Sequence, residues 1–224
     1  MTFSIVARCP ETGACGIGAA TGMPGVGKLL THARAGVGAV ATQGLLNPYL
    51  GIDGLSHLHG RSAPAALNAV LAGDPDRDAR QVALMDADGR SAVWTGPDCI
   101  DWAGSRSGAG YTIQGNLLPG PAVLEACEAA FLAARDRPLA EGLLIALEAG
   151  EGAGGDRRGT ESATIYVVER EEYPLWDIRV DAHAEPLVEL RRLFGVFASD
   201  LIPHIRAMPA RGRREPSGDR GWAA

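Results

Sequence analysis

The sequence has few aromatic residues, no long apolar run and no excess of positive charge. Aromatic residues make up 5% of its 224 residues, and the formal net charge is -6. Few bases could stack on so few rings, and negative charge gives no general attraction to nucleic acid or to an anionic membrane. No apolar stretch approaches the ~20 residues that span a bilayer, and the first residues lack the regions of a signal peptide. We therefore expect a cytoplasmic protein with no nucleic-acid and no membrane partner.

The spacing typical of metal ligands is also missing. The four cysteines are Cys9, Cys15, Cys99 and Cys127. None belongs to a CxxC pair or to a zinc-site pattern. His57 and His59 are two residues apart, so they face different sides of a helix. We expect no metal, no cofactor and reduced thiols, with a disulfide across the first turn as the alternative.

Length and composition indicate one sizeable core. Hydrophobic residues make up 46% of the chain, which is enough for a single domain over residues 1–207. The stretch 208–224 is rich in Arg, Gly, Pro and Ser. We expect it to form a disordered tail.

The first twenty-one residues predict a β-hairpin. Two apolar runs, residues 2–8 and 15–21, flank the turn Pro10-Glu11-Thr12-Gly13. Removal of Met1 would leave Thr2 as the N-terminal residue. The Thr2 hydroxyl is a nucleophile, and an α-amine on the same residue, with an ordinary pKa of about 8, is a base. The alternative is an edge strand that simply ties down the terminus.

Residues 22–29 nearly match the phosphate-binding loop GxxxxGK[ST]. The match fails at Leu29, where the loop needs the hydroxyl that binds Mg²⁺. The segment also follows a predicted antiparallel hairpin, whereas a phosphate loop follows a strand of a parallel sheet. These two departures argue against a nucleotide hydrolase.

Apolar runs and turn residues predict the remaining elements. Strands are predicted over residues 36–43, 81–85, 91–95, 99–103, 111–114, 162–168 and 175–180. Helices are predicted over residues 51–59, 62–74, 120–134, 138–150 and from 185 onward. Apolar positions in the strands run together, so both faces of each sheet are expected to be covered. This order predicts an α+β protein in which helices cover two packed antiparallel sheets, although periodicity alone does not separate it from other α+β sandwiches.

Four spaced blocks of the sequence resemble the domain of unknown function 1028 family, which is grouped with the Ntn-hydrolase superfamily. The blocks are residues 2–8, 34–43, 114–116 and 154–159. The resemblance runs from Thr2 to about Phe194. It implies a four-layer αββα sandwich with the N-terminal residue at the mouth of a cleft between the sheets. It also implies that Thr2 is a catalytic or formerly catalytic residue.

Amide hydrolysis by Thr2 is the first functional hypothesis. Thr2 Oγ would attack a carbonyl, the free amine would take the proton, and water would hydrolyse the acyl-enzyme. Gln114 and Asn116, in a glycine-flanked segment that we expect to be a turn, are candidate donors to the oxyanion. The alternative is that these amides satisfy the neighbouring backbone.

A glycine-rich loop supplies the candidate substrate-binding residues. An arginine at 157 or 158 could hold a substrate carboxylate, and Asp156 could orient that arginine or the amine. Gln43, at the end of an apolar strand, is expected to point into the same cleft. A structural ion pair, formed by Asp156 with Arg157 or Arg158, and a satisfied buried amide at Gln43 are the alternatives.

The second functional hypothesis is a non-catalytic binding or assembly protein that keeps the sandwich. Under the first hypothesis the substrate is a small amide or a peptide-like molecule. Under both hypotheses we expect a homo-oligomer.

Overall fold

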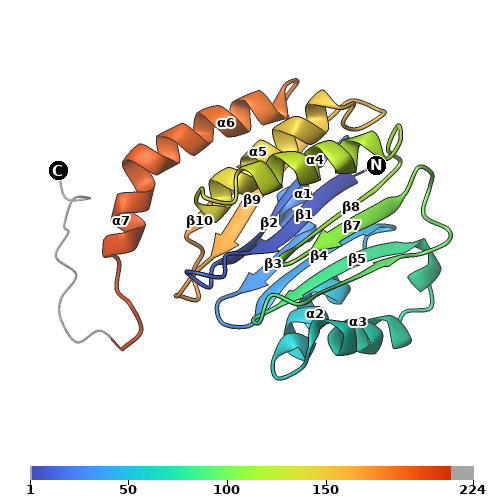
Figure 1. The fold of residues 1–224 in the computed structure, drawn as a ribbon, viewed down its shortest axis with the longest axis horizontal. Coiled ribbons are helices and arrows are strands. Elements are labelled where there is room, and N and C mark those ends of the chain that lie inside the picture. The colour runs from blue at the N-terminus through green and yellow to red at the C-terminus, as the bar shows by residue number, and fades with distance from the viewer. Residues whose placement is uncertain (1, 213–224) are drawn as a thin grey trace.

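The computed structural model of the protein describes residues 2–212, which contain two antiparallel β-sheets and helices around them (Figure 1). Strands β1 (Thr2–Arg8) and β2 (Cys15–Thr21) pair along their whole length. Their register sets Thr2 opposite Thr21. The predicted N-terminal hairpin is confirmed, and so is the α+β class with two antiparallel sheets.

The hairpin lies in the middle of the larger sheet. Within the described residues that sheet has six strands in the order β10-β9-β2-β1-β8-β7. The other four strands are β7 (Gly104–Gly108), β8 (Tyr111–Asn116), β9 (Ser162–Val168) and β10 (Trp176–Val180). Strand β1 therefore pairs with β2 on one side and with β8 on the other, and Thr2 also lies opposite Asn116.

The smaller sheet has four strands in the described part of the chain, in the order β3-β4-β5-β6. These are β3 (Thr31–Arg34), β4 (Gly38–Gly44), β5 (Arg80–Asp86) and β6 (Ser91–Thr95). Strands β4 and β5 contact β1, β2 and β8, so the two sheets face each other.

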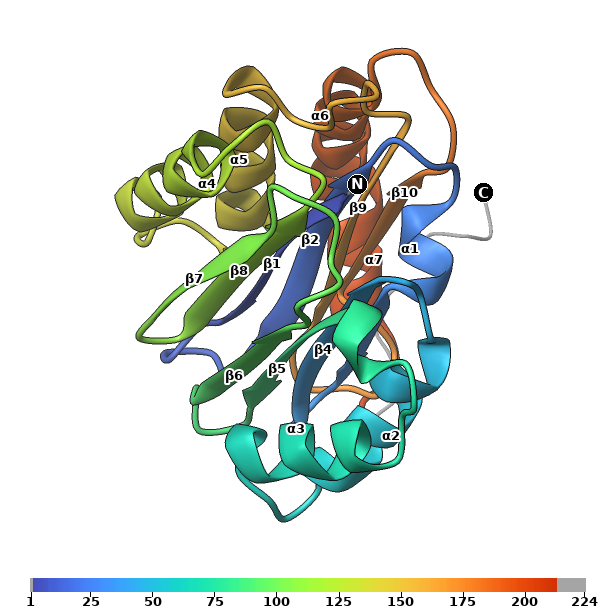
Figure 2. The ribbon, with the colours of Figure 1, turned by 90° about the vertical axis from the view of Figure 1, so that its right-hand side faces the viewer.

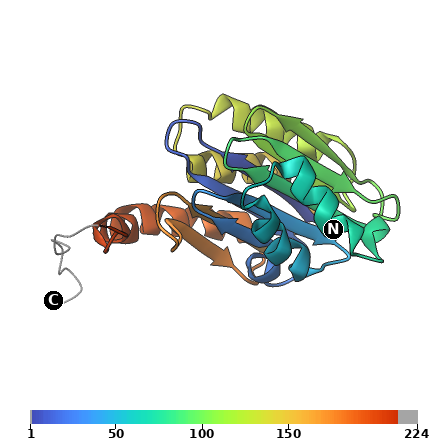
Figure 3. The same ribbon diagram turned by 90° about the horizontal axis from the view of Figure 1, so that it is seen from below.

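Helices cover the outer face of each sheet (Figure 2). Helices α2 (Pro48–Leu58) and α3 (Ala63–Ala72) contact β4 and β5, whereas α4 (Ala122–Ala133) and α5 (Leu139–Gly152) contact β1, β2 and β8. Helix α6 (Pro186–Val196) packs on β9 and β10. A π-helical turn, Phe197–Leu201, joins it to α7 (Ile202–Ala207), which extends away from the sheets (Figure 3).

The alternation of side chains along β1 explains which residues face the other sheet. Phe3 and Ile5 pack in the core shared with α4 and α5. Val6 packs in a separate core with residues of β4 and β5. Successive side chains of a strand point to opposite faces, so Thr2 and Ser4 share the inter-sheet face of Val6.

Three predicted elements differ from the structure. The strand predicted over residues 99–103 is a loop, and β7 begins at Gly104. Gln114 and Asn116 lie on β8 and not in a turn. Helix α2 begins at Pro48 and not near 51, because the Asn47 side chain caps it by accepting a hydrogen bond of 3.1 Å from the amide of Tyr49.

Two of the short elements that were not predicted lie before β4. They are α1 (Val26–Leu29) and strand β3. Helix α1 has only four residues, and β3 is partly exposed, so neither gives a clear apolar period.

The described residues also bear on the state of the thiols, the tail and membrane spans. All four cysteines are free, so no disulfide crosses the first turn. In the tail, Tyr173 Oη donates to the Pro209 carbonyl at 2.9 Å, and the Arg211 amide donates to Glu171 at 3.0 Å. Met1 and the tail from residue 213 lie outside the described residues. No helix within residues 2–212 combines the length and apolar character needed to cross a membrane.

Candidate active site

Thr2 lies at the open end of the N-terminal hairpin, between the two sheets. Its Oγ1 is 3.0 Å from Oγ1 of Thr21, directly opposite on β2. Thr21 is buried, whereas Thr2 is partly exposed. The pair therefore holds one hydroxyl at a fixed place where a ligand can still reach it.

A buried network of polar side chains continues from Thr2 into the space between the sheets. Gln43 Nε2 on β4 donates to the Thr2 carbonyl at 3.3 Å, and Gln43 Oε1 accepts from Ser4 Oγ at 2.7 Å. Ser4 Oγ in turn accepts from Gln114 Nε2 at 2.6 Å. Ser4, Gln43 and Gln114 are each at most 2% exposed. Within the described residues, every buried side-chain nitrogen and oxygen has a hydrogen-bond partner.

Gln81 on β5 is the centre of this network and is fully buried. Its Oε1 accepts from Gln43 Nε2 at 2.7 Å and from Asn116 Nδ2 at 3.0 Å. Its Nε2 donates to the carbonyls of Gly104 and Gly115 at 3.1 and 3.0 Å. The same nitrogen donates to Thr95 Oγ1 on β6 at 2.9 Å. One glutamine thus links β4, β5, β6, β7 and β8. Gln81 and Ser4 were not predicted as site residues, although a polar residue inside an apolar strand is the signal that could have identified both.

The structure separates the two predicted oxyanion donors. Asn116 lines the cavity beside Thr2, and one of its two amide protons is used for Gln81. Gln114 is not among the described residues that line this cavity. Its side chain instead donates to Ser4, so Gln114 supports the strand that carries Thr2.

A cavity of about 610 Å³ opens beside Thr2, and we call it the Thr2 cavity. Its polar wall consists of Thr2, Thr21, Thr42, Gln43, Asp98, Asn116 and Arg158. The volume lies within the range of roughly 300–1,000 Å³ that is typical of small-molecule sites. Three of the predicted site residues, Thr2, Gln43 and Asn116, line this one cavity.

The glycine-rich loop brings Arg158 to the cavity through Asp156. The Asp156 carboxylate is buried and accepts hydrogen bonds from two backbone amides. One belongs to Gly22, which follows β2, and the other, at 2.8 Å, belongs to Arg158. It also pairs with the Arg158 guanidinium at 3.2 Å. Asp156 therefore ties the loop to the hairpin and orients Arg158. Arg157 is exposed and is not among the described residues that line the cavity.

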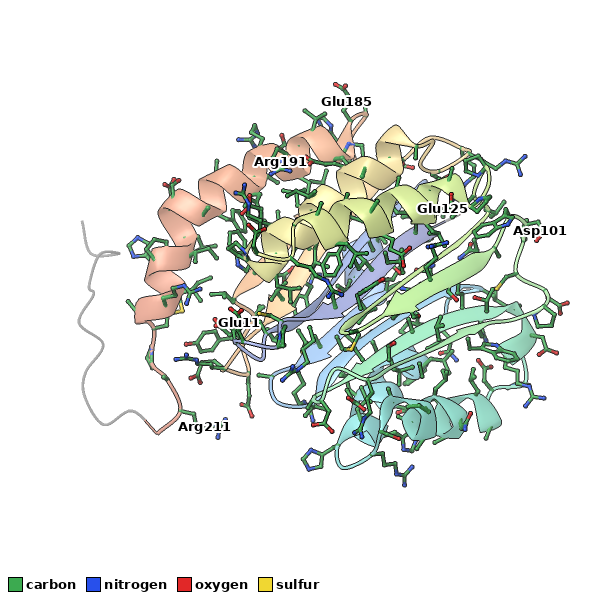
Figure 4. The ribbon with its side chains drawn as sticks, viewed as in Figure 1. Glu11, Asp101, Glu125, Glu185, Arg191 and Arg211 are labelled. Carbon is green, nitrogen blue, oxygen red and sulfur yellow. The ribbon has the colours of Figure 1, made fainter. Side chains whose placement is uncertain are left out.

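Leu117 turns the chain out of β8 at the cavity wall. Its φ of 58° is in the left-handed region, which costs a residue other than glycine on the order of 1–3 kcal/mol. A hydrogen bond of 2.8 Å from the Leu117 amide to the Ile100 carbonyl holds this conformation. Asn116, Leu117 and Ile100 line the cavity together as a result. Asp101 follows Ile100 in the chain. In Figure 4 it is labelled at one end of the sheets, and Glu11, in the β1–β2 turn, is labelled at the opposite end.

The Thr2 cavity carries little charge and has no metal-ligand set. Of the described residues that line it, only Asp98 and Arg158 are charged. Across residues 2–212, no group of three or more His, Cys, Asp or Glu side chains is placed to hold a metal ion. The chemistry that this wall offers is that of hydroxyls, amides, one thiol, one carboxylate and one guanidinium.

Comparison with known proteins identifies the family of the chain. The model of the Family of unknown function (DUF1028) matches residues 2–190. A crystal structure of a DUF1028 protein from Silicibacter pomeroyi is similar, with a TM-score of 0.88, 35% sequence identity, and coverage of 97% of this chain and 99% of that one. Anbu, an ancestral β-subunit from Yersinia bercovieri, gives a TM-score of 0.43 and 12% identity, covering 93% of this chain and 98% of that one. No curated protein matches the sequence. The chain therefore belongs to the DUF1028 family.

Proposed function

We propose that this protein is an N-terminal-nucleophile hydrolase that cleaves a small amide or peptide-like substrate. The observation that carries the proposal is the position of the Thr2 hydroxyl. It lies on the wall of the Thr2 cavity, 3.0 Å from Thr21 Oγ1, on a strand whose first carbonyl is held by Gln43. A fixed hydroxyl at a ligand-sized cavity is what nucleophilic catalysis requires.

The reaction begins after Met1 has been removed and the amine of Thr2 is free. That amine takes the hydroxyl proton while Thr2 Oγ1 forms a bond to the substrate carbonyl carbon. The tetrahedral intermediate collapses, the C–N bond breaks, and the leaving amine takes the proton. A water molecule then attacks the Thr2 ester, which releases the acid and restores the hydroxyl.

Asn116 stabilises the oxyanion in this proposal. Its side-chain amide carries two protons, and Gln81 accepts one of them at 3.0 Å. The other remains for the developing negative charge at the cavity wall. Losing one such donor typically slows a reaction by about 10²- to 10³-fold. Gln114 takes no part in this step and acts through Ser4, as a positioning residue.

The proposal includes the four-layer αββα sandwich of Ntn hydrolases. Its support is that α4 and α5 contact the six-stranded sheet, α2 and α3 contact the four-stranded sheet, and the sheets contact each other. A cytoplasmic location and a homo-oligomeric state are further parts of the proposal.

Hydrolysis of an amide library by protein with a free Thr2 tests the mechanism. We expect Thr2→Ala to abolish turnover and Thr2→Ser to retain part of it. We expect Asn116→Ala to reduce kcat about 10²-fold or more with a smaller effect on KM. Equal turnover by the wild-type protein and Thr2→Ala would reject the mechanism. Binding without turnover in both would favour a non-catalytic binding protein.

A further inference from the structure

Apolar side chains gather at the mouth of the Thr2 cavity. Among the described residues, ten large hydrophobic side chains are exposed, and five of these ten line this one cavity. The five are Met23, Leu29, Leu45, Leu46 and Ile100, each between 41% and 62% exposed. Single exposed apolar residues are ordinary, but a contiguous apolar patch marks a ligand or partner surface.

Three separate segments of the chain supply this apolar mouth. Met23 and Leu29 flank or belong to α1, Leu45 and Leu46 follow β4, and Ile100 lies on the loop before β7. Segments that are distant in sequence thus converge on one opening beside the candidate nucleophile. A wall built in this way has room for a hydrocarbon chain next to the reacting group.

Arg158 gives the same cavity one cationic group. Its side chain is 41% exposed, and its partner Asp156 is fully buried. The Asp156 carboxylate also accepts amides of Gly22 and Arg158, so the guanidinium is oriented by the fold. A guanidinium held in this way places a positive charge at the cavity that can pair with a ligand carboxylate.

We infer that the ligand of the Thr2 cavity is an N-acylated amino acid with an apolar acyl chain. The acyl chain lies against the apolar mouth, the amide carbonyl reaches Thr2 and Asn116, and the carboxylate pairs with Arg158. Only the fate of the bound ligand rests on the proposed hydrolase function. Under that function, water cleaves the C–N bond of the ligand and gives a free fatty acid and a free amino acid. The ligand class itself follows from the walls of the cavity.

Binding to the Thr2→Ala variant tests the ligand class without any turnover. The probes are N-butanoyl-, N-hexanoyl- and N-octanoylglycine, measured by titration calorimetry. We expect affinity to rise roughly threefold for each added methylene group, as burial of a hydrocarbon chain requires. Equal affinity for the three probes would overturn the inference.

Two further variants, each made in the Thr2→Ala background, separate the roles of the mouth and of the guanidinium. Leu45→Ser should weaken the octanoyl probe at least threefold more than the butanoyl probe. The matched control is Val188→Ser. Val188 lies on α6, is 64% exposed and does not line the cavity, so this variant should change the affinity for neither probe. Arg158→Gln should weaken octanoylglycine at least tenfold and leave the neutral octanoylglycine amide unchanged.

Other outcomes distinguish this inference from the hydrolase proposal. Chain-length-dependent binding to Thr2→Ala, with no cleavage of the same probes by protein with a free Thr2, would retain the ligand class and reject hydrolysis. Cleavage of short polar amides, with no binding of the octanoyl probe, would retain hydrolysis and reject the ligand class. A Leu45→Ser variant that leaves binding of all three probes unchanged but dissociates an oligomer would show that a second copy covers the mouth, and would reject the mouth as the site of the acyl chain.

Discussion

The side-chain amide of Gln43, on the four-stranded sheet, donates a hydrogen bond of 3.3 Å to the backbone carbonyl of Thr2, on the six-stranded sheet. The same amide nitrogen donates to Gln81 Oε1 at 2.7 Å. The first residue of β1 is therefore fixed from the opposite sheet as well as by its neighbours β2 and β8. The position of the candidate nucleophile therefore depends on polar side chains that also link the two sheets.

Replacing Gln81 should destabilise the protein strongly. Gln81→Ala would leave amide protons of Gln43 and Asn116 and the carbonyls of Gly104 and Gly115 without their partner. Each buried polar group left unpaired costs roughly 1–3 kcal/mol, so we expect the free energy of unfolding to fall by about 3 kcal/mol or more. Urea denaturation measures this free energy of unfolding. The control is Asp53→Ala, an exposed carboxylate on α2, and a loss from Gln81→Ala no larger than this control would contradict the network.

Gly22 is a second position at which a small change should alter the site. A Cβ at Gly22 would lie 2.6 Å from the Gly159 carbonyl and 2.8 Å from the Asp156 carboxylate. We therefore expect Gly22→Ala to displace the loop that carries Arg158, to lower stability by about 1–3 kcal/mol and to weaken binding of a carboxylate ligand.

Gly195→Ala provides the matched comparison for Gly22→Ala. A Cβ at Gly195, inside α6, meets nothing within 4 Å. Alanine favours a helix over glycine by up to about 1 kcal/mol, so this variant should be as stable as the wild type or more stable. Thermal melts of the two variants compare them directly. Equal melting temperatures for both would show that the contact at Gly22 does not matter.

Much of the fold could be predicted from the sequence because apolar periodicity and turn residues are local signals. The hairpin at Thr2–Arg8 and Cys15–Thr21 and the strand Ser162–Val168 are examples. The loop over residues 99–103 was read as a strand because Ile100 and Trp102 have high strand propensity. Its backbone instead pairs with the chain after β8, where Leu118 donates to the Trp102 carbonyl at 2.9 Å. Such a pairing is set by tertiary structure, which local propensity does not report.

The candidate site was only partly predictable for the same reason. Thr2 was selected as a possible N-terminal nucleophile and Asn116 as an amide in a glycine-flanked segment, and the two lie opposite each other on neighbouring strands. Gln81 was missed because its role depends on five strands meeting around its side chain. Arg157 and Arg158 are adjacent and chemically alike in the sequence, and only the loop geometry shows that Arg158 is the one at the cavity.

The buried pair Asp74–Arg80 should make stability depend on pH in the acidic range. The Arg80 guanidinium donates hydrogen bonds to the Asp74 carboxylate, and the shorter of them is 2.8 Å long. These bonds lower the pKa of Asp74 below its usual 3.8, although burial of the carboxyl acts in the opposite direction. Because the pKa is lower in the folded state, the stabilisation is present above pH 3.8 and is lost as pH falls through the folded-state pKa.

Asp74→Asn tests this pair. We expect it to lower stability by about 3 kcal/mol at pH 7, because the buried guanidinium loses its charged partner. The difference from the wild type should shrink as pH falls below 3.8. Asp76→Asn is the control, since Asp76 also contacts Arg80 at 3.1 Å but is 59% exposed, and its effect should be smaller. A difference that stays constant from pH 7 to pH 2 would contradict the assignment.

The thiols should differ in reactivity because the thiolate is the reactive form. Burial raises the pKa of Cys15 to about 11 and that of Cys127 to about 12. At Cys9, burial acts in the same direction, but hydrogen bonds from Thr12 and from the backbone outweigh it and lower the pKa. We expect iodoacetamide at pH 8 to modify Cys9 first, and Cys9→Ser to remove the fast phase. Equal rates at Cys9 and Cys15 in peptide maps would contradict this order.

The most direct test of the proposed mechanism is the intact mass of untagged protein from its native host, before and after reaction with an electrophilic acyl probe such as a β-lactone. The account predicts a mass lacking Met1, followed by the gain of one acyl group that peptide mapping assigns to Thr2. The Thr2→Ala variant should gain none. A protein that retains Met1 throughout, or one that lacks Met1 and is acylated equally with and without the Thr2 hydroxyl, would contradict the claim that Thr2 is the nucleophile.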